Sequence, residues 1–330
     1  MKSISLLSLI GALSIITQPG NCDSGMNTKD AFARTPIKHA NPIHKHAVNK
    51  KAHKKTSPKN YDIIDRFSIW ELSGASDFKD DFFAVKQKGD IYFQAVGANY
   101  RVNSDLVLGA FYLFDRINSH SPINSAKMHQ NINSVFPYLY YYFNPGLYFY
   151  LAGGYGHASA KLKELDATST PIHGHKSGNI QTLYPALVAN LENGNYLIDL
   201  KLSYIYSSYK EKSYTLSNST VINSSRNDRN NMEFLADFGY RFMGIGSGIK
   251  ALIPYVQGGL DYDVKRTKVF SPFTASANQK FGRGRDGYTG GAILKVLFSN
   301  DLMLGLRYKH TWGHSHLKIN AYSLDLSFKL

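Results

Sequence analysis

Cysteine is almost absent from this 330-residue sequence, which contains Cys22 and no other. A single cysteine cannot form an internal disulfide, so the stability of the fold must come from burial and backbone hydrogen bonding. Outside the start of the chain there is no run of about 18 apolar residues, so no transmembrane helix is predicted. Acidic residues are scarce over residues 29–59, where Asp30 stands against nine lysines and arginines.

Residues 1–22 have the pattern of a secretory signal peptide. Lys2 is the positive n-region, residues 4–16 form an apolar core too short to span a bilayer, and Pro19 and Gly20 end it. Asn21 is unfavourable immediately before a lipidated cysteine, so we expect cleavage at or near Cys22. A short buried helix is the alternative interpretation.

Strand-like runs with period-two alternation begin at Phe67 and continue to the end of the chain. Their lengths of about 10 to 15 residues exceed the usual 5 to 6 of soluble strands and match tilted strands that cross a bilayer. Tyrosine and phenylalanine, with 23 and 19 copies, suit strands and aromatic girdles. We predict twelve strands, at 68–78, 91–102, 105–117, 132–143, 147–161, 179–191, 196–210, 232–242, 251–265, 286–298, 302–312 and 318–330.

The last predicted strand has one apolar face that runs to the chain end. A soluble protein that stops in such a strand exposes an edge that other strands can pair with. In a membrane barrel the last strand pairs with the first, and its apolar face meets lipid. The pattern favours a transmembrane antiparallel β-barrel over a secreted β-sandwich. The residues of this apolar face are Tyr322, Leu324, Leu326, Phe328 and Leu330.

Charged residues alternate with apolar ones in several of the other predicted strands. Burying these charges in a dry sandwich core would be costly, whereas a watery or hydrogen-bonded barrel lumen accommodates them. We therefore predict a set of polar side chains that face the lumen. The set is Asp199, Lys201, Glu233, Asp237, Arg241, Asp261, Asp263, Arg307 and Lys309.

Short and long connections alternate along the predicted strands. The short ones are turn-rich, such as VNSD, FNPG and ENGN. The intervening connections at 118–131, 162–178, 211–231 and 266–285 are long and polar, and only 313–316 is short. Barrels of the outer membrane have short periplasmic turns and long outer loops, and an even strand number places both barrel ends on the periplasmic side. Pro137, Pro185 and Pro254 fall inside predicted strands, where we expect local defects in the hydrogen-bond ladder.

Three stretches resemble the autotransporter β-domain family. GANYRVNSDLVLGAFY (97–112) is similar to the second and third strands of that family, and LYFYLAGGYGHA (147–158) and IPYVQGGLDY (253–262) also resemble it. The terminal strand resembles the outer-membrane assembly signal, which an aromatic residue usually closes; this chain ends in Leu330. The resemblance covers 67–330.

The resemblance implies a twelve-stranded barrel in the bacterial outer membrane, with a linker in its lumen and a passenger exported to the surface. It also implies the outer membrane with its lipopolysaccharide, and the barrel assembly machinery, as partners. Residues 23–66 are too few for a folded passenger. We therefore expect either a passenger reduced to this segment or a barrel used without one.

Residues 23–66 are rich in lysine and histidine and contain few large hydrophobic residues. Such a segment cannot bury enough apolar surface to offset its ordering entropy, so we predict disorder in isolation. Three roles stay open: a solvated linker, a basic arm on lipopolysaccharide phosphates or other polyanions, and a segment threaded through the lumen. We predict no nucleic-acid arm, because an exported chain would rarely meet its target.

The remaining candidates for chemistry are histidines, which we expect to be exposed in loops. No spacing between them and Ser121, Asp166 or Ser315 matches a nucleophile–base motif, and the two His-x-His pairs lack a third metal ligand. We therefore predict no catalytic residue, no metal and no cofactor. The histidines are His120, His129, His157, His173, His175, His310, His314 and His316.

GRGRDG (282–287) lacks the strand-to-helix context of a phosphate-binding loop. We predict that it is a flexible outer loop, in which Lys268, Lys280, Arg283 and Arg285 could contact lipopolysaccharide phosphates. Taken together, the sequence predicts a translocator-like barrel that presents long loops at the cell surface and is not an enzyme. A passive pore, an adhesin that binds host or matrix ligands through its outer loops, and an outer-membrane hydrolase are the alternatives.

Overall fold

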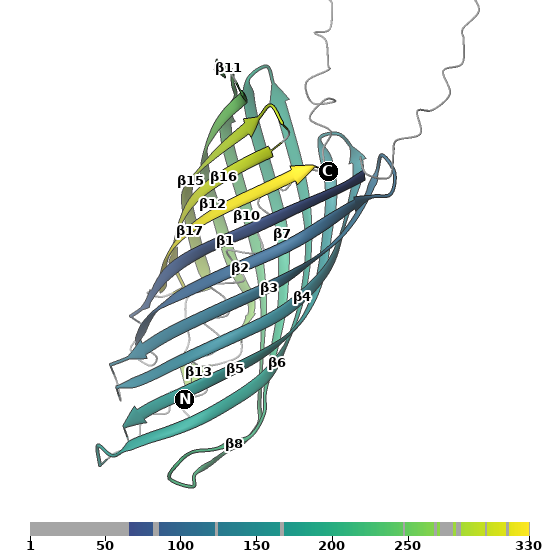
Figure 1. Cartoon of the computed structure of the whole chain (residues 1–330). Coiled ribbons are helices and arrows are strands. Elements are labelled where there is room, and N and C mark those ends of the chain that lie inside the picture. Colours follow the sequence, from purple (N-terminus) through teal and green to yellow (C-terminus); the bar gives the residue numbers. More distant parts are fainter. Residues whose placement is uncertain are drawn as a thin grey trace, which may run out of the picture.

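The structure is a computed structural model that describes residues 66–81, 86–122, 125–165, 168–246, 248–266, 269–270, 280–281, 285–300, 302–314 and 317–329. The predicted segments 1–22 and 23–66, apart from Arg66, lie outside these residues. Twelve long antiparallel strands form the wall of a barrel (Figure 1). They are β1 (Phe67–Asp80), β2 (Gln87–Arg101), β3 (Leu106–Ser121), β4 (Ala126–Asn144), β5 (Leu147–Leu165), β6 (Pro171–Asn193), β7 (Tyr196–Glu211), β10 (Ser225–Tyr240), β12 (Ile249–Arg266), β15 (Asp286–Phe298), β16 (Leu302–Gly313) and β17 (Leu317–Lys329).

The barrel closes between its first and last strands, as the apolar face of the terminal strand predicts. β1 and β17 pair along their whole length, from Ser68 opposite Lys329 to Asp80 opposite Leu317. β10 pairs with both β7 and β12, so the ladder continues around the wall. The short strand β11 (Phe242–Gly246) follows β10 after a break at Arg241 and pairs with β12. Closure leaves the wall strands without a free edge, which a lipid-facing sheet requires.

Side chains alternate between a buried inner face and an exposed outer face along each wall strand. The outer face is apolar over its middle and carries aromatic pairs at both ends. Phe67 and Tyr100 pack at the end with the short turns, and Tyr308 and Tyr322 pack toward the opposite end, each pair with ring centroids 5.1 Å apart. Aromatic rings at both margins of an apolar band are the pattern of an outer-membrane barrel.

The three prolines predicted to fall inside strands lie at defects of the ladder, as expected. Pro137 falls in a gap of the β4–β5 register, between Val135 and Tyr138. Pro185 falls in a gap of the β6–β7 register, and Pro254 lies just beyond the last β10–β12 pair. Proline has no N–H to donate, so it is tolerated where one neighbouring ladder is already interrupted.

The prediction of long polar loops was wrong for much of the end opposite the short turns, which we call the hairpin end. Residues 118–121 and 126–131 continue β3 and β4 as paired strands, and 162–165 and 171–178 do the same for β5 and β6. In Figure 1 these strands run far beyond β15 and β16 at the hairpin end. Both faces of strands that leave the membrane can be polar, so the apolar alternation that marks a strand in the sequence is lost there.

The connection between β7 and β10, also predicted as a loop, contains a small folded hairpin. β8 (Tyr214–Thr215) and β9 (Val221–Ile222) pair with each other, and Leu216 forms a bridge to Gly174 of β6. Leu216 packs with inner-face residues of the wall, including Leu162 and Ile172. Burial raises the pKa of the Tyr214 hydroxyl, and the Glu211 and Glu164 carboxylates raise it further. The hairpin is thus held by a hydrophobic cluster of its own.

Two further short strands, β13 (Val269–Phe270) and β14 (Lys280–Phe281), pair with each other between β12 and β15. Among the described residues, no helix is both long and apolar enough to cross a membrane.

Candidate functional site in the barrel lumen

Aromatic side chains cover the inner face of β1 to β6. Phe111 and Phe136 stack with centroids 4.7 Å apart, and Tyr140 and Tyr150 follow on the same wall at 4.8 Å. The Trp70 indole N–H donates to the Tyr138 hydroxyl at 2.8 Å. This half of the lumen wall is therefore rich in aromatic rings that pack against one another.

Glycines allow these rings to lie flat against the wall. A Cβ on Gly97 would overlap the Trp70 indole, and a Cβ on Gly109 would overlap the Tyr138 ring. Both glycines belong to the 97–112 stretch that resembles a known family. The stretch needs glycine because a ring from a neighbouring strand occupies the space of a side chain.

The opposite half of the wall, β7 to β16, carries buried charged side chains in addition to the rings of Tyr209 and Tyr255. The Glu233 carboxylate lies 3.1 Å from the Lys201 ammonium and 3.3 Å from that of Lys309. Ser203 donates to the same carboxylate at 3.3 Å. Lys309 on β16 and Glu233 on β10 are separated in the sheet by β12 and β15, so their contact spans an arc of the lumen. The Glu233 carboxylate thus pairs with two ammonium groups from different parts of the wall.

A second charged cluster lies closer to the hairpin end. The Arg229 guanidinium donates to Asp263 at 2.6 Å, and Asn231 donates to Asp261 at 2.8 Å. His314 contacts both carboxylates, with its Nδ1 3.4 Å from Asp263. The cluster ties β10, β12 and β16 together at the inner surface.

The inner wall is thus half aromatic and half ion-paired, inside a closed twelve-stranded barrel. The family model described as "Autotransporter beta-domain" matches residues 72–309. The chain belongs to the autotransporter β-domain family. The family and the fold place this barrel in the bacterial outer membrane.

Solved autotransporter structures have the same fold as this chain. The translocator domain of the autotransporter NalP from Neisseria meningitidis matches with a TM-score of 0.67 and 12% identity, covering 80% of this chain and 89% of that one. The β-domain of the Bordetella autotransporter BrkA matches with a TM-score of 0.66 and 14% identity, over 81% and 100% of the two chains. The transport unit of AIDA-I from Escherichia coli matches with a TM-score of 0.61 and 12% identity, over 84% and 94%. None of the curated proteins compared with this sequence matches it.

Most of the polar residues predicted to face the lumen lie on the inner side of this autotransporter barrel. Asp237, on the inner face of β10, accepts a hydrogen bond from Gln257 at 2.7 Å. Asp199 is half-buried opposite it on β7, and Arg307 is half-buried on β16. Arg241 lies apart from both clusters, at the short-turn end, where it contacts Glu192 at 2.6 Å. The set therefore includes members of both charged clusters, three further inner-face residues (Asp199, Asp237 and Arg307) and Arg241 at the rim.

The apolar face of the terminal strand lies on the outside of the barrel. Tyr322 and Phe328 are 55% and 41% exposed, and Leu324 and Leu326 are half-buried. Leu330 lies outside the described residues. This outward orientation makes the strand part of the surface that meets lipid.

The expectation of exposed loop histidines was wrong for His314, which is 2% exposed. Alternation along β16 would place it outward with His310 and Trp312. Positive φ angles of 116° at Gly313 and 45° at His314 turn the chain instead, and the imidazole points inward. Gly313, directly after the predicted strand 302–312, was the one signal of this turn in the sequence.

The other described histidines lie on strands, so the expectation of loop positions was wrong for them too. His157 pairs with Asn179 at 3.1 Å, His310 pairs with Asn320 at 2.7 Å, and His175 lies 3.3 Å from the Ser159 hydroxyl. Within the described part of the chain, no serine–histidine–carboxylate trio appears among these contacts. No group of three or more His, Cys, Asp or Glu side chains there is placed to hold a metal ion.

Two inner-wall carboxylates have no partner among the described residues, and sequence reasoning missed both. Asp115 on β3 is 1% exposed and Asp325 on β17 is 4% exposed. An Oδ1 atom of each is shielded from solvent without a hydrogen bond. Burying an ionised group is energetically costly unless it is paired, so a cation beside either carboxylate would be stabilising.

Proposed function

We propose that the barrel is a surface-exposed translocator barrel whose lumen holds the lysine- and histidine-rich segment 23–66. The observation that carries this proposal is the pair of buried carboxylates, Asp115 and Asp325, which lack a described partner. The segment that directly precedes β1 supplies many lysines and arginines. A cation from it would offset the cost of leaving these carboxylates unpaired.

The length of the segment fits this role. Residues 55–66 enter β1 at the short-turn end, and twelve extended residues span at most about 40 Å. Asp115 lies nine residues along β3 from Leu106, which is about 23 Å deep for a strand tilted by about 40°. Lysines such as Lys55 and Lys59 can therefore reach the carboxylate from the start of β1.

Single-channel conductance in planar bilayers tests the proposal. The chain from residue 23 onward is compared with a chain that lacks residues 23–61. We expect low conductance for the longer chain and a large, steady conductance for the shorter one. Asp115→Asn combined with Asp325→Asn should make the longer chain open more often, whereas Glu192→Gln at the short-turn rim should not. Equal conductance of the two chain lengths would contradict a lumen segment.

Disulfide trapping gives a second, geometric test. In a Cys22→Ser background, Lys55→Cys is paired with Ser134→Cys on the inner face of β4 or with Val135→Cys on its outer face. Ser134 is buried and Val135 is 52% exposed, although they are adjacent in sequence. Oxidation should crosslink the inner pair and spare the outer one. Equal crosslinking of both pairs would place the segment outside the lumen.

A surface adhesin is the second candidate, favoured by the folded β8–β9 hairpin. The hydrophobic cluster around Leu216 gives the hairpin end an ordered tip that a host or matrix ligand could contact. Under this alternative, deleting residues 214–222 abolishes binding of expressing cells to matrix-coated surfaces and leaves the conductance unchanged.

We also propose that the barrel is not an enzyme, in line with a family that is generally not catalytic. The barrel assembly machinery is the proposed partner of β17, whose apolar face points outward. Alanine at Tyr322 and Phe328 should reduce the fraction of chain that reaches the heat-modifiable, folded form in cells.

A further inference from the structure

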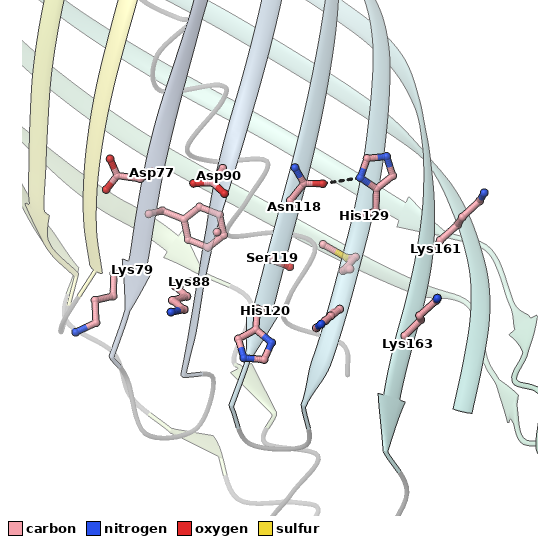
Figure 2. A pocket seen from close by; sticks show the side chains of 14 residues that line it. Asp77, Lys79, Lys88, Asp90, Asn118, Ser119, His120, His129, Lys161 and Lys163 are labelled. Atoms are coloured by element: carbon pink, nitrogen blue, oxygen red, sulfur yellow. Dashed lines mark hydrogen bonds between the residues drawn. The ribbon is translucent and has the colours of Figure 1, made fainter. Parts of the chain in front are cut away.

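Basic side chains from five strands align on the outer face at the hairpin end. Lys79 lies opposite Lys88, Lys88 opposite His120, His120 opposite Lys127, and Lys127 opposite Lys163. One step nearer the middle of the barrel, His129 lies opposite Lys161. Figure 2 shows Lys79, Lys88, His120 and Lys163 of the first row on β1, β2, β3 and β5, and His129 and Lys161 of the second row on β4 and β5. We call the seven residues Lys79, Lys88, His120, Lys127, His129, Lys161 and Lys163 the basic belt.

The surface is hollowed at the basic belt. A pocket of about 830 Å³ is lined by all seven belt residues, together with Asp77 and Asp90. The pocket thus has five lysines against two aspartates. Asp77 accepts a hydrogen bond from Asn320 at 2.8 Å, and Lys79 pairs with Asp81 at 2.8 Å. Within the described part of the chain, the other four lysines form no ion pair.

This arrangement is unfavourable for the barrel by itself. Lys127 and Lys163 are direct cross-strand partners, and so are Lys79 and Lys88. Like charges directly opposite each other destabilise a sheet. His120 adds a ring nitrogen that is shielded from solvent and has no hydrogen-bond partner. An anion between the rows would bridge the lysines and remove this repulsion.

The height of the Lys88 end of the basic belt above the apolar band points to the anion. Tyr92 and Tyr322, 51% and 55% exposed, both lie opposite Ala75 and mark the margin of the apolar band. Lys88 lies four residues beyond Tyr92, which is about 10 Å farther from the membrane centre for a strand tilted by about 40°. Lipid headgroup phosphates lie at this level, directly above the acyl chains that cover the band. We propose that the basic belt binds the phosphate groups of an outer-leaflet lipid.

This site differs from the loop predicted to contact lipopolysaccharide. In that loop Lys268 and Arg283 lie outside the described residues, whereas Arg285 donates to the Tyr262 hydroxyl at 3.4 Å. The basic belt depends on the wall and the outer membrane alone. The site can therefore exist whether or not segment 23–66 occupies the lumen.

Binding of lipid A, a diphosphorylated glycolipid, to the purified full chain in detergent tests the proposal. The test variant is Lys161→Gln with Lys163→Gln on β5. The matched control is Lys210→Gln with Lys212→Gln, two exposed lysines with the same spacing at the hairpin end of β7. We expect about 30-fold weaker binding for the test variant and less than about 3-fold for the control. Heat-modifiable migration should show that both variants fold.

Four outcomes would overturn the proposal. Equal losses of lipid A affinity in the two variants would mean that binding depends on diffuse surface charge. Unchanged affinity in both variants would mean that the basic belt is not the binding site. Equal binding of dephosphorylated lipid would exclude phosphate recognition. Displacement of lipid A by millimolar inorganic phosphate at unchanged ionic strength would assign the site to free anions.

Discussion

Replacing Glu233 with glutamine removes the acid that joins Lys201 and Lys309 and changes the side-chain shape very little. The carboxylate lies 3.1 Å and 3.3 Å from the two ammonium groups, and all three side chains are nearly buried. At an effective dielectric constant of about 20, each contact corresponds to about 5 kcal/mol of Coulomb energy, most of which offsets desolvation. The variant leaves two buried ammonium groups without their acid. We expect it to lower the free energy of unfolding by about 3 to 5 kcal/mol.

Urea unfolding of the barrel in lipid vesicles measures this loss, and the conversion temperature of the folded gel band provides an independent check. Glu192→Gln is the matched control. Its partner Arg241 lies at 2.6 Å, but the Glu192 side chain is 44% exposed, so we expect a loss of at most about 1 kcal/mol. The triple variant Lys201→Met, Glu233→Leu, Lys309→Met should recover most of the stability, because an apolar replacement leaves no unpaired charge. A loss below about 1 kcal/mol for Glu233→Gln would refute the reasoning, since it would mean that water screens the cluster.

Three further predictions concern the wall and the outer hairpin. Gly109→Val should cost about 1 to 3 kcal/mol in urea unfolding, because the new side chain overlaps the Tyr138 ring, whereas Gly153→Val, with nothing within 4 Å of its Cβ position, should cost little. Trp70→Phe should cost about 1 kcal/mol by the same measurement, because the hydrogen bond to Tyr138 is lost; an unchanged midpoint would contradict this. Leu216→Ala should speed proteolytic cleavage within residues 214–222 and leave the barrel's unfolding midpoint unchanged. Val221→Ala, at a 62% exposed position, should change neither the cleavage rate nor the midpoint.

The strands that lie within the apolar band could be predicted from the sequence because side-chain alternation is a local property. The prediction of 286–298 coincides with β15, and the prediction of 302–312 differs from β16 by one residue. Where strands leave the band, as in residues 118–121 and 171–178, both faces can be polar. The alternation then disappears although the ladder continues. The sequence pattern therefore located the membrane-facing parts of the strands and missed their outer parts.

The candidate site was likewise predictable only in part from the sequence. Alternation assigned Lys201, Glu233 and Lys309 to the polar face of their strands, because that requires only the neighbouring residues of each strand. It could not show that Lys309 would meet Glu233, since that contact depends on the stagger and curvature of four strands in the closed barrel. The inward turn of His314 could not be predicted either, because it depends on positive φ angles at Gly313 and His314, where β16 ends.

The sequence by itself determined the class of barrel, its number of strands and which face of each strand is apolar, since lipid imposes an apolar outer face on every spanning strand. Only the tertiary structure decided which side chains meet. Cross-strand register brought the lysines of the basic belt together on the outside, and closure brought the ion pairs together across the lumen. Both arise from pairings between strands that are distant along the chain, which no local pattern records.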